Sequence, residues 1–211
     1  MDTSNLVLVR MPLGPLGTNC YVIGDKKVGE AVIIDPASTE VLEALKKYDL
    51  KPKAVLLTHG HGDHIGGVQG IVDAYDIPIY IQHDDVKYLS DPELNLSNYS
   101  NPTPIIVKGR IEEVREGDHI TCGSVDLTVY ETPGHTPGGV CYYMPGLVFV
   151  GDTLFNQSIG RTDFVEGDYD TLIDAIKTKL YTLPDETMVY PGHGPETQIG
   201  YEKQYNPFVG A

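Results

Sequence analysis

The segment Thr58–His64 reads T-H-G-H-G-D-H and places three histidines and one aspartate close together. It continues the apolar run Ala54–Thr58, which is typical of a strand covered on both faces. In an extended chain, residues two apart point the same way, so His59 and His61 can converge on one metal ion. A surface histidine cluster without a metal is the alternative, but α/β enzymes place their sites at the ends of buried strands. The segment therefore predicts a metal site.

Further polar residues follow apolar stretches in the same manner. Asp63 and His64 face a neighbouring point, where a second ion could bind. His135, Asp152 and His193 each lie in a glycine-bearing turn after an apolar stretch. Taken singly, Asp152 could be a turn or cap residue, and either histidine a hydrogen-bonded buried side chain. Together, five histidines and two aspartates match the ligand set of a two-metal site, which favours Zn²⁺, Fe or Mn²⁺. The remaining histidines, expected to be solvated, are His83 and His119.

Short strands and helices are mixed along the chain. The hydrophobic pattern predicts helices at Ser38–Tyr48, Ile65–Tyr75, His83–Leu89 and Thr171–Leu180. It predicts strands at Leu6–Met11, Cys20–Gly24, Ala31–Ile34, Ala54–Thr58, Ile77–Gln82, Ile105–Val107, Val125–Thr132, Val140–Met144, Leu147–Val150 and Met188–Tyr190. Two sheets packed face to face, with helices outside, account for this order. A single doubly wound sheet is the alternative, but too many strands follow one another without a helix between them.

The composition limits the function classes. The 211 residues suit a single domain, taken as residues 1–211, and 41% hydrophobic residues can fill a core. The formal net charge of -15 repels nucleic acids and anionic membranes. No apolar run is long enough to span a membrane, and the N-terminus has no signal-peptide pattern. The scattered cysteines Cys20, Cys122 and Cys141 indicate thiols in a reducing compartment, so a cytoplasmic location is expected.

T-H-G-H-G-D-H resembles the H-x-H-x-D-H signature of the metallo-β-lactamase-fold hydrolases, and His135, Asp152 and His193 follow in the order of that superfamily. The resemblance covers nearly the whole chain from Gly17–Tyr21 onward. It implies an α/β (α+β) fold, an αββα sandwich of two mixed sheets with the metals at one edge. By position, the first metal would be held by His59, His61 and His135, the second by Asp63, His64 and His193, and Asp152 would bridge them.

Particular residues indicate the branch of the superfamily. Asp152 and His64 resemble the glyoxalase II-like hydrolases, whereas antibiotic-hydrolysing members usually have a cysteine in place of the bridging aspartate. Gly151–Phe164 and Tyr190–Phe208 resemble small, single-domain bacterial glyoxalase II-type proteins. Full-length glyoxalase II has an added helical domain with basic residues for glutathione. The chain stops soon after Phe208, which puts glutathione specificity in question.

The resemblance implies a binuclear hydrolase of small thioesters, such as S-D-lactoylglutathione, with a small molecule as its only expected partner. Two divalent ions, with zinc favoured over iron or manganese, would share a hydroxide that attacks the carbonyl carbon. A thiol has a pKa of roughly 8.5 and can leave without a dedicated acid. Asp63 and Asp152 are expected to be catalytic as well as metal-binding. Asp63 could also donate a proton.

Arg161, in G-R-T-D-F, lies where glyoxalase II has a basic residue near the substrate, and it could anchor a substrate carboxylate. Its alternative is a structural pair with Asp163 or Asp168. Asn95 and Tyr99 are weaker pocket candidates, because they lie in a predicted long loop, Ser90–Thr103.

The main alternative function is a persulfide dioxygenase on the same fold. Its members resemble the G-R-T-D-F stretch but bind one iron, here through His59, His135 and Asp152, and tend to have P-A-H-D where this chain has P-G-H-G (Pro191–Gly194). A phosphodiesterase or RNase would need a basic surface. Purely structural metals would have closed coordination shells. A diiron flavoprotein needs a flavin domain, for which the chain has no room.

Overall fold

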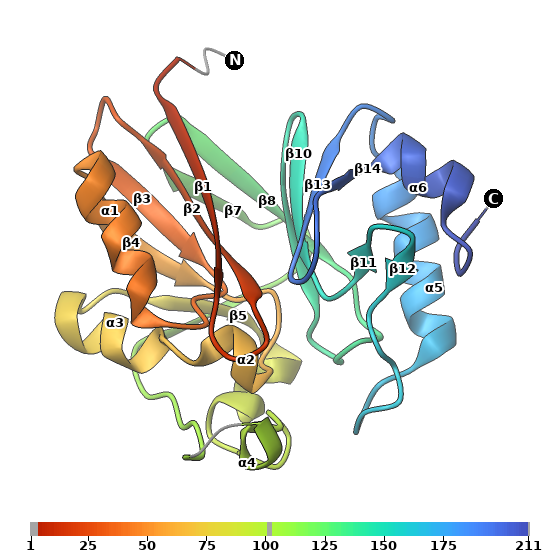
Figure 1. The fold of residues 1–211 in the computed structure, drawn as a ribbon, viewed down its shortest axis with the longest axis horizontal. Helices are drawn as coiled ribbons and strands as arrows, with labels where there is room; N and C mark the ends of the chain where they lie inside the picture. Colours follow the sequence, from red (N-terminus) through yellow and green to blue (C-terminus); the bar gives the residue numbers. More distant parts are fainter. Residues whose placement is uncertain (1–3, 101–102, 211) are drawn as a thin grey trace.

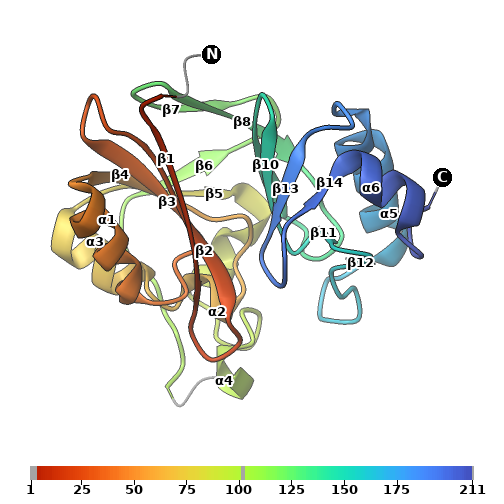
Figure 2. The same ribbon diagram turned by 45° about the horizontal axis from the view of Figure 1, so that its top comes forward.

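The computed structural model describes residues 4–100 and 103–210. Two six-stranded sheets face each other, and helices cover the outer face of each (Figure 1). Both sheets contain parallel and antiparallel pairs, so the predicted αββα sandwich of two mixed sheets is confirmed. The 45° turn in Figure 2 shows the two sheets side by side with α1 and α3 on one flank and α5 and α6 on the other.

The first sheet has the order β1-β2-β3-β4-β5-β6, with antiparallel pairs from β1 to β3 and parallel pairs from β3 to β6. Its strands are β1 (Leu6–Leu13), β2 (Thr18–Asp25), β3 (Glu30–Ile34), β4 (Lys51–Leu56), β5 (Ile79–Gln82) and β6 (Ile111–Val114).

The second sheet has the order β14-β13-β10-β9-β8-β7, and only β10 and β13 run parallel in it. Its strands are β7 (His119–Cys122), β8 (Val125–Glu131), β9 (Val140–Met144), β10 (Leu147–Gly151), β13 (Met188–Pro191) and β14 (Thr197–Gln198). A separate hairpin is formed by β11 (Leu154–Phe155) and β12 (Ser158–Ile159).

The helices lie outside the sheets or in the loops at their edge (Figure 1). The α-helices are α1 (Leu42–Tyr48), α2 (Gly62–Ile65), α3 (Val68–Tyr75), α4 (Ser97–Ser100), α5 (Tyr169–Thr178) and α6 (Ile199–Tyr205). The 3-10 helices are η1 (Thr39–Val41), η2 (His83–Leu89) and η3 (Leu180–Thr182). Within the described ranges, no helix is both long and apolar enough to cross a membrane.

Strand alternation divides the interior into three apolar layers. In β3, Ile33 contacts the layer beneath α1 and α3, whereas Ile34 belongs to the layer between the two sheets. In β10, Val148 packs in the layer against α5 and α6, and Phe149 packs between the sheets. Because successive side chains point to opposite faces, strands buried on both faces are continuously apolar. This is the reason that the runs at β3, β4 and β10 carry so strong a sequence signal.

One predicted strand is wrong, and some strands were not predicted. Ile105–Val107 is not a strand, because its backbone bonds elsewhere: the Val107 N–H donates to the Leu89 carbonyl. The edge strands β6 and β7 were not predicted, since both are short and carry charged side chains or histidine. Of the predicted long loop, residues 97–100 form α4 and residues 101–102 lie outside the described residues, as do residues 1–3 of the N-terminal stretch.

The predicted helix Ile65–Tyr75 is two helices, α2 and α3, separated at Gly66 and Gly67. A Cβ on Gly66 would lie 2.5 Å from the Ala37 carbonyl oxygen, and one on Gly67 the same distance from the Ser38 carbonyl carbon. The two glycines thus allow the chain to pass against the loop after β3. This break lets α2 carry residues of the T-H-G-H-G-D-H segment at a different angle from α3.

Replacing Phe149 by alanine should lower the free energy of unfolding by about 3–5 kcal/mol, because it removes a fully buried ring from between the sheets. The ring lies 5.0 Å from the Tyr21 ring and 5.5 Å from the Tyr190 ring, measured between centroids. Urea unfolding monitored by circular dichroism measures the change. The control is Phe208→Ala, whose side chain is 49% exposed and whose loss should change stability by about 0.5 kcal/mol or less.

Candidate metal centre

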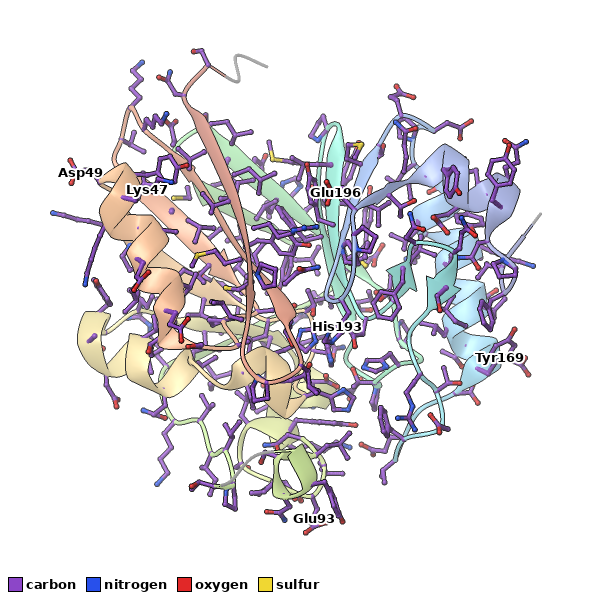
Figure 3. All side chains as sticks on the ribbon, viewed as in Figure 1. Lys47, Asp49, Glu93, Tyr169, His193 and Glu196 are labelled. Carbon is purple, nitrogen blue, oxygen red and sulfur yellow. The ribbon has the colours of Figure 1, made fainter. Side chains whose placement is uncertain are left out.

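The seven residues predicted as metal ligands lie together at one edge of both sheets. Each follows a strand: four come after β4, and one each after β8, β10 and β13. His193, labelled in Figure 3, marks this place near the middle of the molecule. The seven are His59, His61, Asp63, His64, His135, Asp152 and His193.

The first group consists of His59, His61 and His135, all buried, with ligand atoms within 4.8 Å of one another. The rings meet edge to face, with centroids 4.7–4.8 Å apart. His61 Nδ1 and His135 Nε2 approach to 2.9 Å. Three imidazoles with converging nitrogens form a suitable face for one divalent ion.

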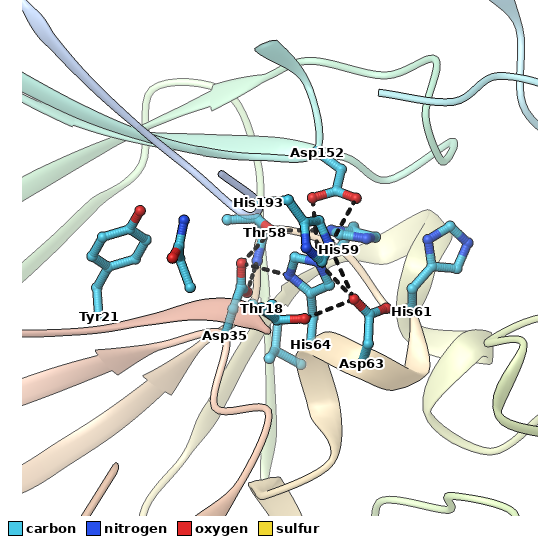
Figure 4. Close-up of polar contacts among 12 residues, drawn as sticks. Thr18, Tyr21, Asp35, Thr58, His59, His61, Asp63, His64, Asp152 and His193 are labelled. Carbon is cyan, nitrogen blue, oxygen red and sulfur yellow. Dashed lines mark hydrogen bonds and ion pairs between the residues drawn. The ribbon is translucent and has the colours of Figure 1, made fainter. Parts of the chain in front are cut away.

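The second group consists of Asp63, His64 and His193. Asp63 Oδ2 lies 3.1 Å from His193 Nε2 and 3.5 Å from His64 Nε2. The Asp152 carboxylate points toward residues of both groups (Figure 4). Its Oδ1 is 3.3 Å from His64 Nε2, and its Oδ2 is 3.6 Å from the Nε2 atoms of both His135 and His193.

The centre of the cluster contains polar atoms that no protein group satisfies. His59 Nε2, His64 Nε2 and Asp152 Oδ1 are buried and have no hydrogen-bond partner among the described residues. Buried polar atoms are normally paired, because leaving them unpaired is costly. Cations bound at the cluster would satisfy these three atoms. The donor set of imidazole and carboxylate therefore fits divalent metal ions.

The outward ring nitrogens are hydrogen-bonded in a way that fixes their tautomers. His135 Nδ1 donates to the Arg161 carbonyl oxygen at 2.6 Å, since a carbonyl can only accept. His64 Nδ1 lies 3.0 Å from Asp35 Oδ2 and donates to that carboxylate. In both rings Nε2 is left facing the cluster, as in metal sites where an outer partner orients the histidine.

Asp35 is a supporting residue that the sequence interpretation missed. It is buried, and its carboxylate accepts hydrogen bonds from the Thr58 N–H at 2.8 Å and the Thr58 hydroxyl at 2.7 Å, besides His64 Nδ1 (Figure 4). Because the Thr58 proton goes to Asp35, the Thr58 oxygen accepts from His59 Nδ1 at 3.1 Å. Asp35 thus orients one histidine of each group. Its place directly after β3 was the available signal.

Asp85 is a second buried carboxylate with a supporting role. It accepts hydrogen bonds from the Gly60 N–H at 2.9 Å, the Thr136 hydroxyl at 2.8 Å and the Gly138 N–H at 2.7 Å. Burial raises its pKa, while these donors act in the opposite direction. Asp85 therefore ties the loop that contains His59 and His61 to the loop that contains His135.

Residues of β2 and Gly151 at the end of β10 hold the turns that carry Asp63, His193 and Asp152 at the cluster. Thr18 Oγ1 donates to Asp63 Oδ2 at 2.8 Å, and Asn19 Nδ2 donates to the carbonyls on both sides of the His193 turn at 2.9 Å. At Gly151, where φ is +49°, a Cβ would collide with the Thr58 side chain. Glycine at this position allows the end of β10 to approach the loop after β4, which places Asp152 over the histidines.

The electrostatic state of the histidines suits metal binding. Burial lowers the pKa of His59 far below its ordinary value, and the neighbouring imidazoles act in the same direction. Burial and His135 lower the pKa of His61 to about 3. Burial also disfavours protonation of His64, but the Asp63 and Asp152 carboxylates raise its pKa overall. His59 and His61 are therefore neutral at pH 7, the form that binds a metal ion, and a cation would replace the proton on His64.

Arg161 forms the structural pair that was the alternative to substrate binding. Its Nε and Nη2 donate to the two carboxylate oxygens of Asp163, each at 2.8 Å. The guanidinium carbon also lies 4.1 Å from the centroid of the Phe164 ring. Asp168 is not a partner, because its carboxylate caps α5 by accepting from the Thr171 N–H.

A cavity of about 460 Å³ opens beside the cluster. It is lined by five of the seven cluster residues together with Leu16, Asn95, Leu96, Tyr99, Phe155, Arg161 and Phe164. Asn95 and Tyr99, predicted as weaker pocket residues, do line it. Both polar atoms of the Asn95 side-chain amide have protein partners, because Nδ2 donates to the Tyr88 carbonyl and Oδ1 accepts from the Ser97 N–H. His83 and His119 lie elsewhere and are exposed, as expected.

The chain matches the family described as the Metallo-beta-lactamase superfamily over residues 13–193. It belongs to this superfamily. It is 35% identical to the hydroxyacylglutathione hydrolase GloC of Haemophilus influenzae, with 94% of this chain and 96% of that protein aligned.

Two solved structures are similar over nearly the whole chain. The B3 metallo-beta-lactamase BLEG-1 matches with a TM-score of 0.89 and 42% identity, covering 96% of this chain and 99% of that one. ETHE1 from Myxococcus xanthus matches with a TM-score of 0.78 and 31% identity, covering 95% and 83% respectively. A protein named as a B3 metallo-beta-lactamase and one named ETHE1 thus both share this fold with the chain.

Replacing Asp35 by asparagine should weaken divalent-metal binding by about 10- to 100-fold, because it removes the carboxylate that orients His59 and His64. Competition with a chromophoric chelator measures the affinity. The matched control is Asp126→Asn, which changes an exposed aspartate that likewise accepts from a histidine Nδ1, that of His119. Equal affinities in the two variants would contradict the supporting role of Asp35.

Proposed function

We propose that the chain is a binuclear metal-dependent hydrolase of small thioesters, of the glyoxalase II type. The observation that carries the proposal is the position of Asp152, whose carboxylate oxygens lie within 3.6 Å of His64 in one group and His135 in the other. One carboxylate between two sets of imidazoles is the arrangement that two neighbouring cations require.

In this proposal the residues divide between two divalent ions, with zinc preferred and iron or manganese as alternatives. The first ion would be held by His59, His61 and His135, the second by Asp63, His64 and His193, with Asp152 shared. When bound, such ions supply a hydroxide at neutral pH and polarise a carbonyl oxygen. The neutral state of His59 and His61 and the fixed tautomers of His64 and His135 prepare the chain for them.

The reaction adds water across a thioester. The water oxygen bonds to the carbonyl carbon, the carbon–sulfur bond breaks, and the products are a carboxylic acid and a thiol. Asp63 and Asp152 line the cavity and are placed to orient the attacking water. Thr18 holds the Asp63 carboxylate in place through Oδ2.

The cavity offers no free acid for a poor leaving group. Of the described residues that line it, each histidine and aspartate belongs to the metal cluster, and the Tyr99 hydroxyl donates to Glu93 at 2.6 Å. A thiol, with a pKa of about 8.5, departs as the thiolate without such an acid. An amine leaving group would need a proton. This difference supports a thioester over a lactam or other amide.

The similarity to GloC also supports thioester hydrolysis, since that relative is named a hydroxyacylglutathione hydrolase. The acidic composition, with a net charge of -15, agrees with a small molecule as the partner in place of nucleic acid or a membrane, in a cytoplasmic setting. The persulfide dioxygenase alternative would use only His59, His135 and Asp152. It would leave the group of Asp63, His64 and His193 without a function.

Metal analysis of the purified protein should find about two divalent ions per chain, because two groups of ligands share one carboxylate. Lactoyl thioesters should then release thiol, measured with a chromogenic thiol reagent, whereas a β-lactam should be turned over far more slowly. One iron per chain with oxygen uptake on glutathione persulfide would reject the hydrolase in favour of the dioxygenase.

Replacing Asp152 by alanine should lower both the metal content and the rate of thioester hydrolysis, the rate by about 100-fold or more, because the shared ligand is lost. Elemental analysis and thiol release measure the two effects. Asp174→Ala, which removes an exposed carboxylate from α5, serves as the control. Retained metal and rate in the Asp152 variant would contradict the bridging position.

A further inference from the structure

The cavity beside the metal cluster has apolar walls. Leu16, Tyr99, Phe155 and Phe164 line it, together with Leu96, and its volume of about 460 Å³ suits a small-molecule ligand. Leu16 is 59% exposed and Tyr99 is 76% exposed, so the apolar surface continues out to solvent. Exposed apolar side chains grouped at a cavity indicate that the ligand has an apolar part.

The only permanent cation among the described lining residues is already occupied. Arg161 uses two of its N–H groups on Asp163, in a bidentate pair, and one face of its guanidinium on the Phe164 ring. A bidentate pair of this kind uses the fork that would otherwise bind a substrate carboxylate. An anionic substrate must therefore compete with Asp163 for this edge of Arg161 or use the N–H groups that the pair leaves.

An acidic residue lies next to another wall of the cavity. Glu93 accepts hydrogen bonds from the hydroxyl of the lining residue Tyr99, and Figure 3 labels Glu93 beside α4. Lys87, which does not line the cavity, is paired with Glu166 at 2.5 Å. Among the described lining residues, the one permanent cation, Arg161, is thus paired with a carboxylate, and Glu93 adds a negative charge beside Tyr99. Glutathione presents two carboxylates and one ammonium group, so its thiol half would find no unpaired arginine or lysine on these walls.

We propose that the site takes thioesters whose thiol half is uncharged and apolar, and that Asp163 selects against anionic thiols by holding Arg161. The inference rests on the proposed thioester hydrolysis and names its substrate class. In the reaction the acyl group is transferred to water as before. The apolar walls bind the departing thiol half, and no protein cation is required for it.

The geometry makes Asp163 a clean position to test. The Arg161 backbone is fixed independently of its side chain, because the Arg161 carbonyl accepts from His135 Nδ1. Asp163 is itself exposed, so its replacement by asparagine leaves no buried group unpaired. Asp163→Asn should therefore free the guanidinium of Arg161 while the metal cluster stays in place.

The experiment compares three lactoyl thioesters that share one acyl group: those of glutathione, N-acetylcysteamine and benzyl mercaptan. In the unmodified, metal-loaded protein, kcat/KM should be highest for the benzyl thioester and at least about tenfold lower for the glutathione thioester, a factor that corresponds to about 1.4 kcal/mol. In Asp163→Asn, kcat/KM for the glutathione thioester should rise about fivefold through a lower KM, and high salt should remove the gain. The values for both neutral thioesters should change by less than about twofold, within the range of an exposed ion pair.

The matched control is Asp185→Asn, which removes an exposed carboxylate paired with Lys203 away from the cavity and should leave all three values unchanged. A preference for the glutathione thioester in the unmodified protein would overturn the inference. So would an Asp163→Asn variant that changes charged and neutral thioesters alike.

Failure of the proposed function gives a different result. If no thioester is hydrolysed, thioester hydrolysis is wrong, and the binding of stable thioethers then decides the inference about the cavity. Calorimetry with benzyl thioethers of N-acetylcysteamine and of glutathione compares a neutral with an anionic ligand of the same apolar group. Tighter binding of the neutral thioether than of the anionic one, with a higher affinity for the anionic thioether in Asp163→Asn, supports the inference about the cavity. Tighter binding of the anionic thioether by the unmodified protein overturns it.

Discussion

The carboxylate of Asp152 lies between two groups of imidazoles, and the rest of the structure serves to keep those groups within reach of it. Each group combines residues from both sheets. His59, His61, Asp63 and His64 follow β4 in the first sheet, whereas His135 follows β8 and His193 follows β13 in the second. The cluster exists only where the two sheets pack with these strand ends together. The apolar layer between the sheets therefore sets the distances within each group.

That packing alone would not orient the rings. Asp35 and Asp85 are both buried carboxylates, and neither belongs to the groups of candidate metal ligands. Each accepts three hydrogen bonds, and each joins loops that are far apart in the chain. Because every oxygen is paired, burial of these charges is compensated locally. The cost of leaving polar atoms unpaired is concentrated at the centre, where a cation would remove it.

The sequence predicted the sandwich and brought all seven cluster residues to notice, because the strands are apolar on both faces and their following turns carry glycine, histidine and aspartate. Asp35 was missed although it too follows a strand, since a lone aspartate before proline looks like a turn residue. Asp85 could not have been found, because its three donors come from loops 25 to 53 residues away. The edge strands β6 and β7 were missed because each has only four residues, with two glutamates in β6 and only two buried positions in β7.

Arg161 shows a different limit of sequence reasoning. The motif G-R-T-D-F permits both a substrate anchor and an internal pair with Asp163, and only coordinates distinguish them. Arg161 belongs to the walls of the cavity, which have a different origin from the candidate metal ligands. The ligands lie at strand ends, whereas the walls come from other segments: Tyr99 from α4, Phe155 from the β11–β12 hairpin, and Phe164 from the segment before α5.

Loops on a rigid scaffold can change the ligand without changing the chemistry that the scaffold supports. The chain resembles a hydroxyacylglutathione hydrolase at 35% identity and a B3 metallo-beta-lactamase at 42% identity, both over nearly its full length. Because proteins with different names are similar to this chain to such an extent, the similarity indicates the shared sheets and strand ends and does not identify the substrate. The proposed preference for an uncharged, apolar group therefore rests on the walls of the cavity, where Arg161 is paired with Asp163 and several aromatic side chains lie.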